Sequence, residues 1–329
     1  MPRPSLPPHL GSVFTVADAR RAGVTPSRLR ARDLEAPYRG LRVVRADGFR
    51  PRTSALSAGE TAASELRARA IAFARTMPAN QYFTHVTAAV LWGLPVPSSL
   101  LRDTFGRLRP LDVGVFSPLR HPRHAGVRGH QVRPGSARVI EHGLSGVRLT
   151  TAASTWAMLG AVIVDEYDLV AVGDAVVREQ MFRDDPPPLA TPDQLRAAAA
   201  AGRRVGIRAL RRALPRVRVR SASRMETRCR LILVDAGMPE PELNFAVRDE
   251  TGELVACVDL AYPELMIAIE YEGEQHLTDP AQWAKDIARY EALAAMGWFV
   301  VRVTKSDVFD GASALVRRVR QARRSRADV

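Results

Sequence analysis

The sequence has two cysteines and two lysines in 329 residues, and it contains no apolar run of the roughly 18 residues that a membrane span needs. Cys229 and Cys257 lack the spacing of a disulfide framework or a metal site, which favours a reduced compartment. The first ten residues lack the apolar stretch of a secretion signal. We therefore expect a cytoplasmic protein with no membrane partner. A hydrophobic content of 46% is sufficient for folded domains.

The positive charge comes almost entirely from arginine and is unevenly distributed. Residues 1–220 contain 34 arginines and 17 acidic residues, a net charge of +17, whereas residues 221–329 carry a net charge of −4. Arginines that meet a phosphate backbone release its counterions, so the basic half indicates DNA as a partner. Clustered carboxylates in the acidic half suit a cation. Codon bias explains arginine in place of lysine, but it does not explain why the two halves differ in sign.

Residues 14–45 predict a winged helix-turn-helix. A short helix over residues 16–21 is followed by a turn at Gly23, and Thr25 and Pro26 are typical of the start of a second, recognition helix. A strand over residues 38–44 has the alternation of a wing. A helical hairpin with a solvated basic face is the alternative. The candidate DNA-binding residues are Ser27, Arg28, Arg30, Arg32 and Arg39.

Residues 60–180 predict a mixed α/β segment without a nucleophile or a phosphate loop. We expect helices over about 62–76, 84–93, 154–159 and 168–178, and strands over 111–116 and 147–150. Three prolines at 186–188 mark a boundary, and residues 194–214 predict one Ala/Arg-rich helix.

The first 180 residues resemble the AbiEi-type antitoxin family of abortive-infection systems. The resemblance covers about residues 10–180 and rests on "FTVADARRAGVTPSRLR", "YRGLRVV", "THVTAAVLWGLPVP" and "GVRLTTAASTWAML" with "DLVAVGDAVVR". It implies a winged-helix DNA-binding domain that represses its own operon, followed by an α/β domain. It also implies a cognate toxin as a protein partner.

The C-terminal residues predict the order α-β-β-β-α-β-α, with a mixed sheet flanked by helices. The expected helices cover residues 223–235 and 280–296 and a basic segment at the end. The expected strands cover 244–248, 254–262, 265–271 and 298–303.

Carboxylates interrupt these apolar strands. Asp259 lies between apolar residues, and Glu270 directly follows an apolar run. A buried carboxylate needs a partner, because desolvation of the charge is costly. A hairpin would place Asp259 and Glu270 opposite each other, with Glu270 and Glu272 on one face of the sheet. Converging carboxylates form a hard-oxygen site, which suits Mg²⁺ or Mn²⁺.

Residues 221–310 resemble the PD-(D/E)xK nuclease superfamily, and more narrowly a bacterial domain family related to the very-short-patch-repair (Vsr) mismatch endonuclease. The matching segments are "SRMETRCRLILVDAGMPEPELNF", "VDLAYPELMIAIEYEGEQH" and "DIARYEALAAMGWFVVRVT". The resemblance implies Asp259 as the central metal ligand, Glu270 as the second acid and the Tyr271 carbonyl as a further ligand. Glu226 matches the acid on the first helix. Asp286 and Arg289 match a charged pair on a later helix.

The chain departs from the superfamily at Glu272, where most members have lysine. Glu272 could bind a second metal ion or orient water, and the fixed cation could then be Arg289 or Lys285. Alternatively, the domain is inactive. His276 could carry a proton.

Ordinary structural roles remain open for each of these residues. Glu226, three residues after Ser223, could be the acid of a capping box. Glu270 and Glu272 could be exposed at a strand end, His276 could be a loop residue, and Asp286 with Arg289 could be a helix salt bridge.

Together these patterns predict an α/β multidomain protein. The expected parts are a winged helix (1–58), an AbiEi-like α/β domain (59–183), a Pro-rich linker with a basic helix (184–220) and a restriction-endonuclease-like domain (221–329). The predicted function is metal-dependent endonucleolytic hydrolysis of DNA in a defence or toxin–antitoxin context. One alternative is an antitoxin-like transcriptional repressor with an inactive nuclease-like domain. A nuclease that acts on RNA is a further alternative, although the sequence shows no aromatic stacking platform that would favour RNA.

Overall fold

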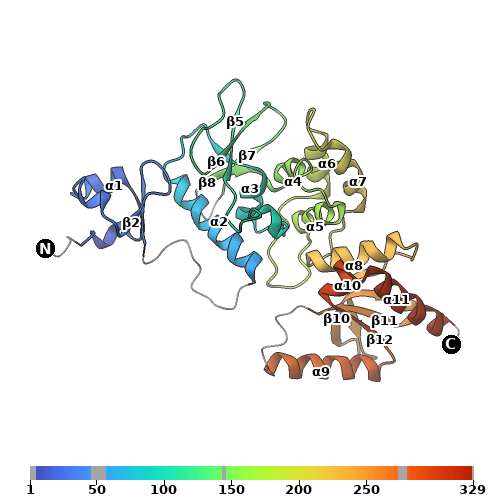
Figure 1. Cartoon of the computed structure of the whole chain (residues 1–329). Helices are drawn as coiled ribbons and strands as arrows, with labels where there is room; N and C mark the ends of the chain where they lie inside the picture. Colours follow the sequence, from blue (N-terminus) through green and yellow to red (C-terminus); the bar gives the residue numbers. More distant parts are fainter. Residues whose placement is uncertain (1–4, 46–56, 143–145, 273–279, 328–329) are drawn as a thin grey trace. The chain divides into compact units, whose positions relative to one another are not determined.

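The computed structural model describes residues 5–45, 57–142, 146–272 and 280–327, and the side chains of 280–286 are left out of the description. The chain forms two compact units, the first with two β-sheets and the second with one (Figure 1). The first unit comprises Met1–Val164 with Asp193–Arg211, and the second comprises Asp165–Pro192 with Arg212–Val329. Within the described ranges, no helix has the length and apolar character needed to cross a membrane.

The N-terminal part of the first unit is a small antiparallel sheet with strand order β1-β3-β2. Leu10, Phe14 and Leu34 belong to its buried core. Thr15 caps the first helix by accepting the backbone N–H of Asp18. The elements are η1 (Pro8–Leu10), β1 (Val13–Thr15), α1 (Val16–Arg21), η2 (Arg28–Arg30), β2 (Leu34–Glu35) and β3 (Leu41–Val44).

The expected α-helical recognition helix after Thr25 does not form in this described segment, which contains a single 3-10 turn, η2 (Arg28–Arg30). Local side-chain bonds hold the segment in this shape. The guanidinium of Arg28 folds back onto both carboxylate oxygens of Asp33, at 3.0 and 2.7 Å. Leu29 is the one buried residue of the turn, so the segment has too little apolar surface to anchor a longer helix.

The remainder of the first unit is built on a mixed sheet with strand order β6-β5-β4-β8-β7. The strand expected at 111–116 and the helix ending at Gly93, whose φ is 75°, are both confirmed. The elements are α2 (Ala58–Ala74), β4 (Tyr82–Phe83), α3 (His85–Trp92), η3 (Ser98–Leu100), β5 (Leu111–Phe116), β6 (Val127–Val132), β7 (Val139–His142), β8 (Val147–Thr150) and α4 (Ala152–Leu159).

The single helix expected over 194–214 is wrong, because two helices, α6 (Pro192–Ala200) and α7 (Ile207–Ala213), form there. Gly202 and Gly206 separate them with φ angles of 70° and 84°. A Cβ atom on Gly206 would lie 2.1 Å from the carbonyl oxygen of Gly160, so only glycine fits this close approach.

From α8 to α11 the second unit has the order of elements expected from its sequence, except that a short helix, α10, precedes the final helix, and α5 comes before them all. Its sheet has the order β12-β11-β10-β9, in which β11 and β12 are parallel and the other neighbours are antiparallel. The elements are α5 (Glu166–Val177), η4 (Leu214–Arg216), α8 (Arg224–Asp235), β9 (Glu242–Arg248), β10 (Leu254–Tyr262), η5 (Pro263–Leu265), β11 (Ile267–Tyr271), α9 (Pro280–Ala295), β12 (Phe299–Val303), α10 (Lys305–Phe309) and α11 (Ala312–Ala327).

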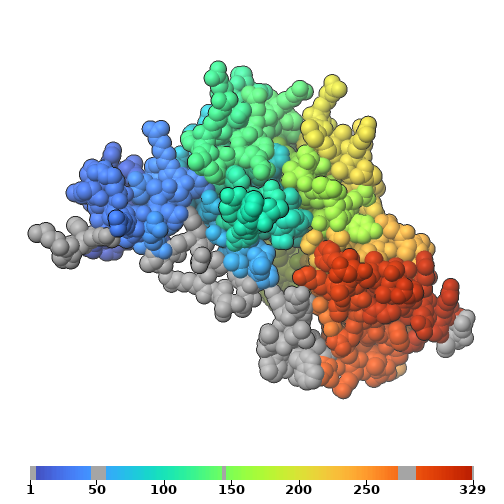
Figure 2. Space-filling model, in the orientation of Figure 1, coloured from blue at the N-terminus to red at the C-terminus, as the bar shows by residue number. Residues whose placement is uncertain are grey.

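Two separate apolar cores fix the layers of the second unit. One core contains Leu293 of α9 with Ala261 and Ala268 of the sheet. The other contains residues of α8, α10 and α11 together with Leu260 and Ile269. The sheet is therefore buried between α9 and the layer formed by the other three helices. On the outside of that layer, arginines of α11 are exposed, and Figure 2 shows this red segment at the surface.

Helix α5 packs against α8 within the second unit, whereas the sequence had placed it in the middle segment of the chain. Charged side chains make this contact. Asp168, 4% exposed, accepts hydrogen bonds from the guanidinium groups of Arg224 and Arg228 of α8 at 2.7 to 2.9 Å. The start of α8 is thus attached to a helix some 50 residues earlier in the chain.

Candidate functional site

Asp259 and Glu270 lie on neighbouring antiparallel strands. The register pairs Leu260 with Ile269 and Ala261 with Ala268, so one further step along it brings Asp259 opposite Glu270. Asp259 Oδ2 accepts the backbone N–H of Tyr271 at 2.8 Å. This register agrees with the sequence-based prediction that the two acids lie opposite each other.

The strand that carries Asp259 is irregular at this residue. Val258 packs in the core on the α9 side, whereas Leu260 packs in the core on the α8 side. The pairing with β9 runs from Val258↔Phe245 to Leu260↔Leu243, and Asn244, which lies between them on β9, has a φ of 45°. Asp259 therefore lies where β10 changes the face on which its side chains are buried.

Glu226 lies in the first turn of α8, where Ser223 is the N-cap and accepts the Glu226 backbone N–H at 3.1 Å. In a capping box the glutamate would accept the N–H of Ser223. Here Oε2 of Glu226 accepts the N–H of Ala222 and the side-chain amide of Asn244, both at 2.8 Å. The carboxylate is directed toward β9. Ser223 therefore caps the helix as in a capping box, but Glu226 does not complete the box.

Glu270 is buried, 3% exposed, and Arg289 of α9 is its cationic partner. The distance from Arg289 Nη1 to Glu270 Oε1 is 3.2 Å. The predicted pair of Asp286 and Arg289 is described only in part, because the side chain of Asp286 lies outside the described residues. Arg289 contacts Glu270, as a cation beside the site would.

The three acids Glu226, Asp259 and Glu270 are electrostatically linked. Burial and, to a lesser extent, repulsion by Asp259 together raise the pKa of Glu226 to about 7, although hydrogen bonds from Ala222 and Asn244 oppose the shift. Burial likewise raises the pKa of Glu270 to about 8, again with repulsion by Asp259, and Arg289 opposes the shift. Three mutually repelling carboxylates, two of them buried, are unstable when all are ionised, so this region favours the binding of protons or of a cation.

Glu272 points to other partners. Its carboxylate forms an ion pair with Arg302 of β12, with Nη2 2.5 Å from Oε2. Tyr290 of α9 donates its hydroxyl to Glu272 Oε1 at 3.3 Å. Glu272 thus lies near α9, as Glu270 does, but its charge is neutralised by Arg302.

The predicted metal ligands are not assembled into a closed coordination shell. Among the side chains in the described ranges, no three His, Cys, Asp or Glu residues are grouped closely enough to hold one ion. The carboxylates instead accept hydrogen bonds from the protein. Glu226 accepts one from Ala222, Asp259 one from Tyr271 and Glu270 one from Arg289. His276 and the side chain of Lys285 lie outside the described residues.

The predicted DNA-binding residues belong to the first unit. Ser27, Arg30, Arg32 and Arg39 are exposed. Arg28 differs, because its side chain is 9% exposed and is engaged with Asp33. Arg28 therefore has a structural role that its sequence position did not reveal.

Sequence reasoning missed Asn244, Tyr290 and Arg302. Asparagine is depleted in strands and tolerates positive φ, so Asn244 within an apolar strand was a signal that could have been used. Tyr290 and Arg302 gave no such signal, because a tyrosine on a helix and an arginine in a strand near a surface are ordinary.

Comparisons with known proteins give limited information. No protein-family model matches the chain, and no solved structure matches it. Two uncharacterized proteins of Mycobacterium tuberculosis, from strains CDC 1551 / Oshkosh and ATCC 25618 / H37Rv, are each 38% identical to the chain over 111 residues. The match covers 34% of this chain and 40% of each relative, so the chain spans about two fifths of the length of these relatives.

Proposed function

We propose that the second unit is a metal-dependent endodeoxyribonuclease domain of the PD-(D/E)xK, Vsr-related kind. The observation that carries the proposal is the convergence of Glu226, Asp259 and Glu270 from α8, β10 and β11, with two of the three carboxyls buried. The order of elements and the mixed sheet agree with this class. The first unit would supply DNA affinity through its N-terminal segment, in which Arg30, Arg32 and Arg39 are exposed to solvent.

The residues present fit a hard divalent cation. Glu226, Asp259 and Glu270 offer only oxygen donors, which a hard divalent cation prefers. Their mutual repulsion, seen as raised pKa values at Glu226 and Glu270, would be relieved by a positive charge. In the structure these three acids are not grouped closely enough to hold one ion, so they would have to be drawn together by Mg²⁺ or Mn²⁺ to bind it, with the Tyr271 carbonyl as a further candidate ligand.

A bound metal ion would supply Lewis acidity toward the phosphodiester. The protein groups have distinct tasks around it. Asp259, fixed by the Tyr271 N–H, would orient the reacting centre, and Glu270 would exchange the proton that it holds in the metal-free protein for the bound ion. Arg289 would provide the fixed cation beside the phosphate, since Glu272 occupies the position where the superfamily usually has lysine.

Plasmid cleavage tests the proposal. Purified protein is incubated with supercoiled DNA and Mg²⁺ or Mn²⁺, alongside Asp259→Asn and an EDTA control. The matched control variant is Glu264→Gln, which removes an exposed carboxylate from the same hairpin. We expect nicked or linear DNA from the wild type and Glu264→Gln, and a loss of at least about 100-fold in Asp259→Asn and in EDTA. No cleavage by a wild-type protein that retards the same DNA in a gel would overturn the nuclease proposal.

One observation favours a second function, that of an antitoxin-like transcriptional repressor with a cognate toxin partner. The superfamily usually has a lysine at the position of Glu272. Glu272 itself forms an ion pair with Arg302, which leaves it less available for catalysis. In that case the second unit would be an inactive interaction module. Retardation of DNA from upstream of its own gene, with no cleavage and no Mn²⁺ binding, is the result that this function predicts.

A further inference from the structure

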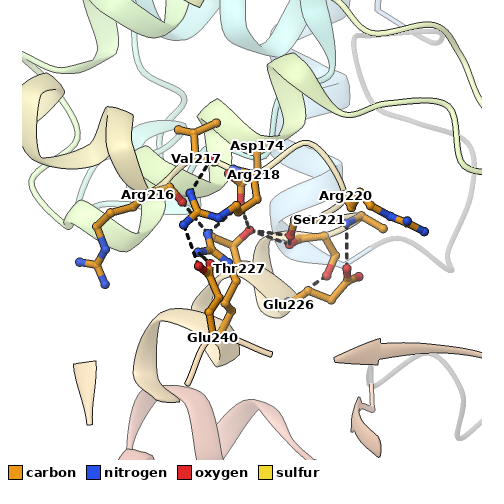
Figure 3. A network of polar contacts seen from close by, with 12 residues as sticks. Asp174, Arg216, Val217, Arg218, Arg220, Ser221, Glu226, Thr227 and Glu240 are labelled. Atoms are coloured by element: carbon orange, nitrogen blue, oxygen red, sulfur yellow. Dashed lines mark hydrogen bonds and ion pairs between the residues drawn. The ribbon is translucent and has the colours of Figure 1, made fainter. Parts of the chain in front are cut away.

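A largely buried polar network joins α5 to the first turn of α8 (Figure 3). Asp174 of α5 is 1% exposed. Its Oδ2 accepts the hydroxyl of Thr227 and its Oδ1 accepts the backbone N–H of Arg218, both at 2.7 Å. The guanidinium of Arg230 lies 3.4 Å from Oδ2. One carboxylate therefore fixes both the chain before α8 and the helix itself.

The network continues to Glu226. Thr227 is the next residue after Glu226, and its hydroxyl lies 2.8 Å from the hydroxyl of buried Ser221. Ala222, the next residue after Ser221, donates its backbone N–H to Glu226 Oε2 at 2.8 Å. Figure 3 shows Asp174, Ser221, Thr227 and Glu226 gathered in this single network.

The second donor to Glu226 is tied to the same segment. Asn244 donates its side-chain amide to Glu226 at 2.8 Å and also to the carbonyl of Arg220 at 2.7 Å. Arg220 returns a bond from Nη2 to the Asn244 carbonyl at 3.2 Å. Both groups that orient the Glu226 carboxylate thus depend on residues 218–222, which Asp174 anchors at Arg218.

We propose that Asp174 and Thr227 are positioning residues for the Glu226 carboxylate. Asp174 holds residues 218–222 against α8, and Thr227 transmits this restraint to Ser221 and the adjoining N–H. Without the restraint, Glu226 turns away from Asp259 and Glu270. The inference rests on the proposed metal site, to which Glu226 contributes one acid.

This role is separable from simple stabilisation. Arg230 also pairs with Glu240 at 2.7 Å and donates to the Arg216 carbonyl at 2.8 Å, so it retains partners when Thr227 is changed. A buried ion pair contributes little net stability compared with a packed apolar pair. By contrast, removal of a group that orients a metal ligand typically lowers metal affinity or activity about 10- to 100-fold.

The test compares Thr227→Val, which removes the hydroxyl at nearly constant volume, with Thr227→Ser, which keeps it. Both are made in the full-length chain, and thermal melting confirms that each is folded. Mn²⁺ affinity is measured by titration calorimetry. The Asn244 side-chain amide is followed in ¹H–¹⁵N spectra, where its signal is identified by its loss in Asn244→Gly.

We expect Thr227→Val to shift the Asn244 amide signal and to weaken Mn²⁺ binding about 10-fold, with a similar loss in the cleavage rate and an unchanged KM for DNA. Thr227→Ser restores all of these values. A folded Thr227→Val variant with the wild-type Asn244 signal and the wild-type Mn²⁺ affinity would overturn the inference. A wild-type protein that binds no Mn²⁺ would instead refute the proposed metal site, and the Asn244 signal alone would then decide whether Thr227 positions Glu226.

Discussion

The side-chain amide of Asn244 donates to the carboxylate of Glu226 over 2.8 Å, from a backbone whose φ angle is 45°. Asparagine is one of the few residues other than glycine that adopt this left-handed conformation readily. The same residue therefore allows the irregularity opposite Asp259 and orients an acid on another element. Local backbone geometry and the proposed site are coupled at this residue.

The backbone of Asn244 can be tested by paired substitutions. Asn244→Ala and Asn244→Gly both remove the amide, but only alanine is strained at this φ angle. We expect Asn244→Gly to be the more stable variant by about 1 kcal/mol. Alanine is destabilised by the left-handed backbone, and this cost exceeds the additional conformational entropy that glycine loses on folding. Urea unfolding midpoints measure the difference. Equal midpoints, or a more stable alanine variant, would contradict the strained backbone.

Stability should fall as pH rises across the neutral range when no metal ion is bound. Burial raises the pKa of Glu226 to about 7 and that of Glu270 to about 8, whereas the ordinary value of a glutamate is 4.5. The folded state then holds protons that the unfolded state has released above about pH 4.5. Because the unfolded state binds fewer protons, the free energy of unfolding decreases with pH until about pH 8, by at most about 1.4 kcal/mol per pH unit for each proton held.

Urea unfolding between pH 6.5 and 8 in EDTA measures this slope. Glu270→Gln, which keeps an acceptor for Arg289, should flatten it, and saturating Mn²⁺ should reverse the loss in the wild type. A slope that is the same in the wild type and in Glu270→Gln would show that Glu270 does not titrate in this range.

Glu270 and Glu272 should contribute unequally to metal binding, although the sequence assigned both to the site. Glu270 is buried beside Arg289 and senses the charge of Asp259, whereas Glu272 is neutralised by Arg302. We expect Glu270→Gln to weaken Mn²⁺ binding at least about 10-fold, and Glu272→Gln to change it much less. Titration calorimetry of the two variants provides the comparison. A larger loss in Glu272→Gln would assign Glu272 as a ligand after all.

The arrangement of the second unit could be predicted because its signals are local. Alternation, a two-strand hairpin and side-chain parity place Asp259 opposite Glu270 without any knowledge of the rest of the chain. The attachment of α5 could not be predicted in this way. Its contacts pair Asp168 and Asp174 with residues some 50 positions later, and buried charge pairs leave no periodic pattern in the sequence.

The errors in the first unit have a different cause. The Ala/Arg-rich pattern of 194–214 is helical throughout, but the close approach of Gly206 to Gly160 divides it. The expected recognition helix has good start signals, yet the contact of Arg28 with Asp33 favours a tight turn. In both cases a tertiary or side-chain contact overrides the helix propensity of the segment.

Arginines of the N-terminal segment should separate into two groups in DNA binding. Arg30, Arg32 and Arg39 are exposed, and each that contacts a phosphate should lower the slope of log K against log salt by about 0.9 when replaced by alanine. Arg28→Ala should instead destabilise the first unit by about 1 to 2 kcal/mol, because it loses both bonds to Asp33. Fluorescence anisotropy at several salt concentrations, with melting curves, resolves the two effects. Unchanged slopes in all three exposed variants would remove this surface from the DNA interface.

Helix α5 should be necessary for a stable second unit. A fragment of residues 165–329 keeps the partners of Arg228 and Arg230, whereas a fragment of residues 213–329 loses Asp165, Asp168 and Asp174. Removal of one side of a buried ion pair costs about 3 to 5 kcal/mol, and α8 also loses its packing against α5. We expect cooperative thermal unfolding of the longer fragment and little or none of the shorter one.

Single substitutions in the full-length chain make the same comparison without truncation. Asp168→Asn weakens two contacts of a carboxylate that is 4% exposed, whereas Glu179→Gln weakens a pair with Arg220 in which both side chains are about half exposed. A buried charge that loses its partner has no water to replace it, so Asp168→Asn should clearly lower the unfolding midpoint of the second unit. Glu179→Gln should change the free energy of unfolding by less than about 1 kcal/mol, because water screens the exposed pair. If the fragment of residues 213–329 melts at the same temperature as that of residues 165–329, and Asp168→Asn behaves like Glu179→Gln, then α5 is a neighbour of this fold rather than part of it.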